Sequence, residues 1–109
     1  MRTAWRCGGD YEWGQHRTIA LGAGLSADEV ERIAGALGWV GFEATLLDAA
    51  DELIDDHCIS DATWRALAER YDEQQLIELP MLVGHYALLA GALRSFGVER
   101  EPGVEGFDS

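Results

Sequence analysis

The stretch EQQLIELPMLVGHYALLAGALRSFG, residues 73–97, decides the fold. Between Leu76 and Leu93 its apolar residues cover nearly the whole circumference of a helix, a pattern typical of a helix buried on every side. Pro80 removes one backbone hydrogen bond within this helix and predicts a kink there. In a chain of 109 residues, burial on every side needs a neighbouring subunit, so we expect a homo-oligomer.

Helical patterns also precede this stretch. In GFEATLLDAADELIDD, residues 41–56, apolar residues repeat along one face and acidic residues occupy the remaining positions. Ser60 is placed to cap the next helix, and Asp72 with Gln75 is placed to open the last one. This order of caps and apolar faces predicts consecutive helices without strands.

The N-terminal third reads as two further helices. Ser26 and Glu29 form a capping-box pattern ahead of the second. The first runs from Thr3 to about Leu21 and carries Gly8 and Gly9, which weaken it by about 1 kcal/mol each relative to alanine. The sequence therefore predicts an all-α domain of about five helices over residues 1–97, followed by a flexible C-terminal tail over residues 98–109.

Composition excludes several classes of function. Twenty acidic residues against eight basic ones give a formal net charge of −12, which disfavours nucleic acid and anionic membrane surfaces. The two cysteines lie far apart and form no zinc or redox motif. No signal-peptide pattern opens the chain, and the longest uninterrupted apolar run is too short to span a bilayer. We expect a cytoplasmic protein with no nucleic-acid or membrane partner.

The candidate site lies in YEWGQH, residues 11–16. Glu12 and His16 are four residues apart and share a helix face, and Gly9 leaves space on that face. Cys7 falls on the opposite side, which argues against a histidine-activated thiol. Spacing alone favours an ordinary surface pair over the alternative, an acid–base pair in which the glutamate stabilises the imidazolium.

Three residues around this pair are candidate substrate-binding groups. Tyr11 and Trp13 flank Glu12, and their aromatic rings indicate partial burial. His85 lies in the last helix, where a lone histidine is more often structural than a ligand. With Tyr86 beside it, His85 could reach the first helix and supply a second polar group to a pocket. No metal site is predicted at the neighbouring residues His57 and Cys58, because adjacent side chains point in different directions.

Nearly the whole chain, from Arg2 to Val98, resembles the carboxymuconolactone decarboxylase-like family, which also contains the AhpD-type alkylhydroperoxidases. The similar segments are RTAWRCGGDYEWGQHRTIALGAGLSADEVERIA, DAADEL and ISDATWRALAERYDEQQLIELPMLVGHY. YEWGQH and DEQQLIEL with the later VGHY are the most specific pieces. The resemblance implies an AhpD-like helical fold that assembles into trimers or hexamers. Family members carry a further N-terminal region before RTAWRC, which we expect this chain to lack.

The resemblance also implies a reaction. The peroxidase branch of the family places Cys-x-x-Cys four residues before a histidine. In this chain His16 matches that histidine, while Glu12 and Gly9 occupy the cysteine positions, so both redox sulfurs are absent. The decarboxylase branch implies cofactor-free loss of CO₂ from a carboxylated γ-lactone, with His16 as proton donor and Glu12 orienting it. Three arginines remain open alternatives for binding a substrate carboxylate: Arg6, Arg17 and Arg94.

Three functional hypotheses follow. The first is a decarboxylase, or a related lyase or isomerase, that acts on a small acid or lactone through Glu12 and His16 without cofactor or metal. The second is a peroxide-reducing protein, which the missing Cys-x-x-Cys disfavours. The third is a non-catalytic oligomeric helical module or a truncated remnant of an enzyme.

Overall fold

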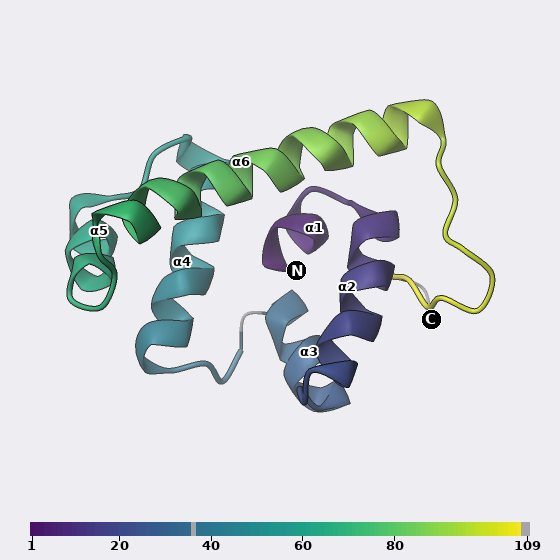
Figure 1. Ribbon diagram of the computed structural model, residues 1–109, viewed down its shortest axis with the longest axis horizontal. Coiled ribbons are helices and arrows are strands. Elements are labelled where there is room, and N and C mark those ends of the chain that lie inside the picture. The colour runs from purple at the N-terminus through teal and green to yellow at the C-terminus, as the bar shows by residue number, and fades with distance from the viewer. Residues whose placement is uncertain (36, 108–109) are drawn as a thin grey trace.

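The computed structural model describes residues 1–35 and 37–107, and within them it contains six α-helices and no strand. The helices are α1 (Arg2–Arg6), α2 (Asp10–Gly22), α3 (Ala27–Gly35), α4 (Gly41–Asp56), α5 (Asp61–Ala68) and α6 (Glu73–Phe96). Figure 1 shows α6 along one edge of the molecule, with α4 and α5 under its N-terminal half and α1, α2 and α3 under its C-terminal half. The prediction of an all-α fold is confirmed.

The predicted helix caps are present. Ser26 accepts a hydrogen bond from the Glu29 amide at 3.1 Å, and the Glu29 carboxylate accepts one from the Ser26 amide at 3.0 Å. A second capping box joins Asp72 and Gln75 at the start of α6. At the start of α5, the Ser60 hydroxyl accepts a hydrogen bond from the Thr63 amide. Side chains thus satisfy part of the N-termini of α3, α5 and α6.

The prediction of a single helix from Thr3 to about Leu21 is wrong, because the chain turns at Gly8 and Gly9 and forms two helices. Gly8 has a φ of +68°, a left-handed conformation that glycine adopts without steric cost. The Gly9 amide then donates back to the Ala4 carbonyl at 2.7 Å. The two glycines therefore end α1 and begin α2.

Helix α1 is the centre around which α2, α3, α4 and α6 pack. Its Ala4 forms a buried cluster with Trp13 of α2 and Val30 of α3. On its other side, Arg2 and Arg6 both bind the Asp51 carboxylate of α4, at 2.8 and 2.9 Å. This short helix is held by partners on three neighbours rather than by its own propensity, since five residues are too few for a stable isolated helix.

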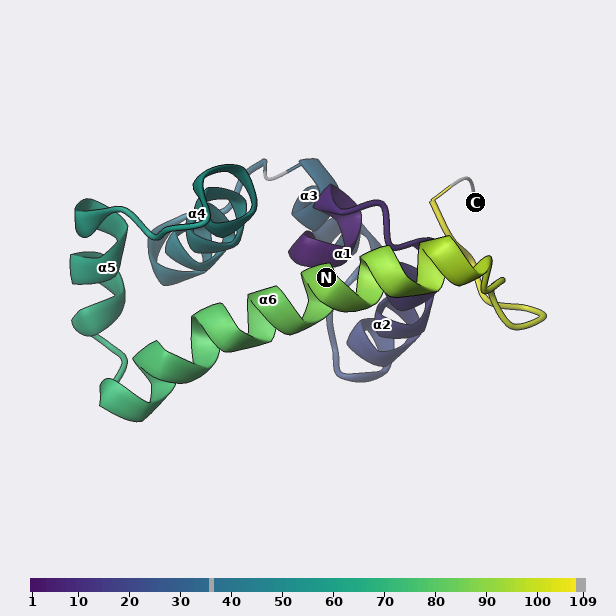
Figure 2. The ribbon, with the colours of Figure 1, turned by 90° about the horizontal axis from the view of Figure 1, so that it is seen from above.

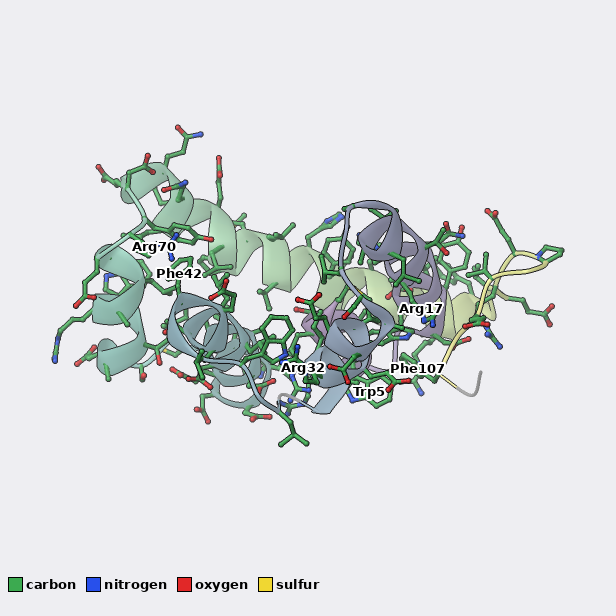
Figure 3. All side chains as sticks on the ribbon, turned by 90° about the horizontal axis from the view of Figure 1, so that it is seen from below. Trp5, Arg17, Arg32, Phe42, Arg70 and Phe107 are labelled. Atoms are coloured by element: carbon green, nitrogen blue, oxygen red, sulfur yellow. The ribbon has the colours of Figure 1, made fainter. Side chains whose placement is uncertain are left out.

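The C-terminal segment returns to α2. Phe107 packs on Trp5 and Trp13, with ring centroids 4.9 and 6.0 Å apart, and its amide donates to the Asp10 carboxylate at 2.8 Å. Arg17 of α2 also binds the Glu105 carboxylate at 2.9 Å. Figure 3 shows Trp5 and Phe107 close together, with Arg17 in the same half of the molecule, while Phe42 and Arg70 meet in the opposite half.

Helix α6 is not buried on every side in the single chain. It runs without interruption past Pro80, and only Val83 and Ala90 are buried. The remaining apolar residues include Ile77, Met81 and Leu88, which are more than half exposed. Figure 2 shows no described element lying over this outer side. By length and composition alone, α6 is the one helix in the described residues that could cross a membrane.

Candidate functional site

Both ring nitrogens of His16 are held. Nδ1 lies 3.0 Å from the Glu12 backbone carbonyl one turn earlier in α2, and Nε2 lies 2.9 Å from the Tyr86 hydroxyl of α6. A carbonyl oxygen can only accept, so Nδ1 carries the proton and Nε2 of the neutral ring is the acceptor for the Tyr86 O–H. The tyrosine ring stands edge-on to the imidazole at 5.1 Å. His16 is thus oriented by two elements that are far apart in sequence.

The Glu12 side chain is buried but has no hydrogen-bond partner. It is only 3 % exposed, and neither carboxylate oxygen meets a donor among the described residues. The resemblance implied that the Glu12 carboxylate orients the imidazole. The backbone carbonyl of Glu12 does so instead. A buried, unpaired carboxylate is costly, and such groups in native proteins need a specific explanation.

Gly9 explains how this carboxylate fits inside the protein. A Cβ atom at position 9 would overlap Oε2 of Glu12 and would lie 3.2 Å from the Cβ of Ala90. The Glu12 side chain therefore folds back over Gly9, between the start of α2 and the inner face of α6. Because Glu12 lies in the first turn of α2, the positive end of that helix partly offsets its charge.

The three candidate arginines have different binding partners in the structure. The Arg6 guanidinium binds the carboxylates of Asp51 and Asp55, which raises its pKa, and Arg17 binds Glu105. Arg94 has no carboxylate within ion-pair distance among the described residues, and it donates to the Cys7 carbonyl at 3.3 Å. Arg94 is therefore the arginine still available to bind an anion near the start of α2.

Gly8 makes this position of Arg94 possible. A Cβ atom at Gly8 would lie 2.8 Å from Nη1 of Arg94. The guanidinium thus lies against backbone rather than against a side chain. Together, Gly8 and Gly9 admit a cation on one side of the turn and a carboxylate on the other.

A pocket of about 320 Å³ lies beside Cys7, between α4 and α6. Its lining is mainly apolar and comprises Cys7, Leu53, Ile54, His57, Pro80, Val83, Gly84 and Ala87. Burial raises the pKa of the Cys7 thiol above its ordinary value of 9.0, and the nearby Glu12 charge raises it further, against the lowering effect of Arg6. Cys7 is thus a poor nucleophile at neutral pH, because the thiolate is the reactive form.

The predicted substrate-binding residues lie in different surroundings. Trp13 is buried in the aromatic cluster with Trp5 and Phe107, and Tyr11 is half-buried on α2. His85 is exposed, and among the described residues its ring contacts only the perpendicular Tyr86 ring, with centroids 5.5 Å apart. Within the described chain, no group of three or more His, Cys, Asp or Glu side chains converges as a metal site would require.

Sequence reasoning missed the role of Tyr86. In the sequence it stands out only as the neighbour of His85, yet Tyr86 rather than His85 reaches α2. The two residues are adjacent on α6 and point about 100° apart, so the choice between them depends on how α6 packs against α2. Only the spacing of Tyr86 from the buried Val83 and Ala90 could have indicated that it faces inward.

Comparison with known proteins adds no assignment: neither a family model, nor a curated protein, nor a solved structure matches this chain. The resemblance to the carboxymuconolactone decarboxylase-like family therefore stays a prediction.

Proposed function

We propose that this chain is a cofactor-free acid–base catalyst that decarboxylates a small lactone or carboxylic acid, as the resemblance to carboxymuconolactone decarboxylases implies. The observation that carries the proposal is the His16 ring, held between the Glu12 carbonyl and the Tyr86 hydroxyl beside a buried, unpaired carboxylate. An ordinary surface pair explains neither the burial of Glu12 nor the contact with Tyr86.

The hydrogen bonds define a path for one proton. In the substrate, the bond between the carboxylate carbon and the ring breaks, CO₂ leaves, and the electron pair remains on the lactone as a dienolate. The Tyr86 hydroxyl gives its proton to the dienolate carbon and takes another from Nε2 of the His16 imidazolium. His16 is left neutral with its proton on Nδ1, the tautomer that the Glu12 carbonyl holds, and solvent restores the second proton.

Glu12 supplies the charge that this path requires. Its carboxylate lies in a water-poor position one turn from His16, where a negative charge stabilises positive charge that develops nearby during proton transfer. No hydrogen bond links the carboxylate to the ring, so its role is electrostatic rather than orienting. In a buried site such an interaction is stronger than it would be in water.

Substrate binding would use Arg94, the candidate arginine without an ion-pair partner in the described part of the chain, and the apolar surface beside Cys7. Arg94 is placed to bind the substrate carboxylate, because a guanidinium matches a carboxylate with two parallel hydrogen bonds. The pocket beside Cys7 has a volume and an apolar lining that suit the carbon skeleton of a small lactone, but His16, Tyr86 and Arg94 are not among its lining residues.

Release of CO₂ from a panel of carboxylated γ-lactones and small unsaturated acids tests this proposal. We expect turnover by the wild type and a loss of about 10²–10⁴-fold in kcat for His16→Ala and for Tyr86→Phe. Tyr71→Phe is the matched control, since Tyr71 packs edge-to-face with Phe42 at the far end of the molecule. Equal turnover by wild type and His16→Ala would contradict the proposal.

The peroxidase alternative finds no support in the geometry. The raised pKa of Cys7 opposes thiolate formation, and the two cysteines of the chain are not joined in a disulfide. Thiol-dependent consumption of peroxide that disappears in Cys7→Ser would favour it instead. A folded oligomer that is inert towards both sets of substrates would favour a non-catalytic module.

A further inference from the structure

One exposed flank of α6 carries a regular seam of residues at alternating spacings of four and three, and Gly84 of this seam also lies at the edge of the pocket beside Cys7. It consists of Ile77, Met81, Gly84, Leu88, Gly91 and Ser95. All six are exposed, and Met81 and Leu88 are each 70 % exposed. Spacings of four and three give the 3.5-residue repeat by which two helices pack along a shared seam, with bulky side chains of one entering gaps on the other.

The positions of these residues are symmetric about Tyr86, and their sizes are complementary. Gly84 and Leu88 lie two positions before and after Tyr86. Met81 and Gly91 lie five positions before and after it, and Ile77 and Ser95 lie nine positions before and after it. Each mirrored pair combines one bulky side chain with one small residue. At Gly84 and Gly91, no atom lies within 4 Å of where a Cβ would be, so both positions are open to an incoming side chain.

From this pattern we infer that two copies of this chain pair through α6 in antiparallel orientation about a two-fold axis at the level of Tyr86. A two-fold axis brings each residue opposite the residue at its mirrored position in the partner. Leu88 then enters the gap at the partner's Gly84, Met81 the gap at the partner's Gly91, and Ile77 lies opposite the partner's Ser95. A parallel pair would instead place bulky on bulky and glycine on glycine.

The charges of α6 agree with the antiparallel orientation. The N-terminal half of the helix carries Glu73 and Glu78, and the C-terminal half carries Arg94. Antiparallel pairing keeps the two acidic N-terminal halves apart and opposes the two helix dipoles. The six seam residues are uncharged, so the net charge of −12 lies elsewhere on the molecule.

A second copy accounts for the seam better than a bilayer does. Four helices, α1, α2, α4 and α5, contact α6 on its inner side, so only one stripe of it could face lipid. The strongly acidic chain would also be repelled by an anionic membrane surface. A bilayer, moreover, requires no mirror relation between bulky and small residues along the helix.

The orientation can be tested by disulfide trapping in a Cys7→Ser, Cys58→Ser background. A Gly84→Cys chain is mixed with a longer, tagged Leu88→Cys chain and oxidised. The antiparallel pair predicts disulfides mainly between the two different chains. Disulfides that form mainly within each variant would show a parallel seam and overturn the inference.

Light scattering and sedimentation on the wild-type chain and on Gly91→Leu test the seam itself. We expect an even number of subunits for the wild type and a dissociation constant raised about tenfold or more for Gly91→Leu. Gly22→Leu is the control, because Gly22 lies at the end of α2 and is also open. A wild-type monomer or trimer, or a monomer that floats with phosphatidylcholine vesicles, would overturn the inference. None of these readouts depends on catalytic activity.

Discussion

Replacing Glu12 by methionine should stabilise the protein, although the glutamate is buried. Its carboxylate is 3 % exposed and accepts no hydrogen bond from the described residues, so the folded chain bears the cost of removing this charge from water. That cost is at least about 3 kcal/mol for an ion in a protein interior. The position in the first turn of α2 returns about 1 kcal/mol. Methionine has a similar length and no charge, so we expect a net gain of about 2 kcal/mol in the free energy of unfolding.

Urea titration of wild type and Glu12→Met at pH 7 measures this gain directly. A midpoint of thermal unfolding higher by roughly 10 °C should accompany it in a domain of this size. Glu31→Met is the matched control, since Glu31 is exposed on α3 and its replacement should change the free energy by less than about 0.5 kcal/mol. If Glu12→Met is neutral or destabilising, the carboxylate has a favourable partner in the folded protein, and the reasoning is refuted. A stabilised variant that has lost activity would show a residue kept for function at a cost in stability.

Three further predictions concern groups around the site and at the start of α5. Gly9→Ala places a methyl group where it overlaps Oε2 of Glu12, so it should lower the free energy of unfolding by about 1–3 kcal/mol in a urea titration; an unchanged value would show that the carboxylate moves freely. Iodoacetamide should alkylate Cys7 more slowly than the exposed Cys58 at pH 8, as peptide mass spectrometry would reveal, because burial raises the pKa of Cys7; equal rates would count against this. Partial burial raises the pKa of Glu52, but hydrogen bonds from neighbouring hydroxyl and amide groups outweigh it and hold the pKa below 4.5. Its stabilising effect is therefore present above pH 4.5 and lost as the pH falls through the folded-state value, and Glu52→Gln should remove that part of the acid sensitivity in unfolding curves.

The parts of the fold that depend on local sequence were predictable. A capping box needs only residues three apart, and the Ser26–Glu29 and Asp72–Gln75 boxes form as the sequence indicates. The apolar periodicity of residues 41–56 likewise gives one helix with the predicted bounds. These signals do not depend on how the helices pack, which is why the sequence alone carries them.

The parts that depend on distant partners were not predictable. The turn at Gly8 and Gly9 admits Arg94 and the Glu12 carboxylate, and both space requirements depend on where α6 lies. Phe107 likewise has the aromatic cluster on α1 and α2 as its partner, nearly a whole chain length away.

The candidate site also has a part that local sequence predicts and a part that depends on distant residues. The one-turn spacing of Glu12 and His16 is enough to place both residues on one helix face. The separate roles of Glu12 and His16 could not be predicted from the sequence, because they depend on a hydrogen bond between His16 and Tyr86, which are 70 positions apart in the chain.

The ¹⁵N–¹H long-range spectrum of the His16 ring at neutral pH tests the central claim most directly, since it needs no substrate. The account predicts a ring that keeps a proton on Nδ1 and an Nε2 signal that moves when Tyr86 is changed to phenylalanine. A ring with its single proton on Nε2, or a spectrum that Tyr86→Phe leaves unchanged, would contradict the proton path on which the proposed function rests.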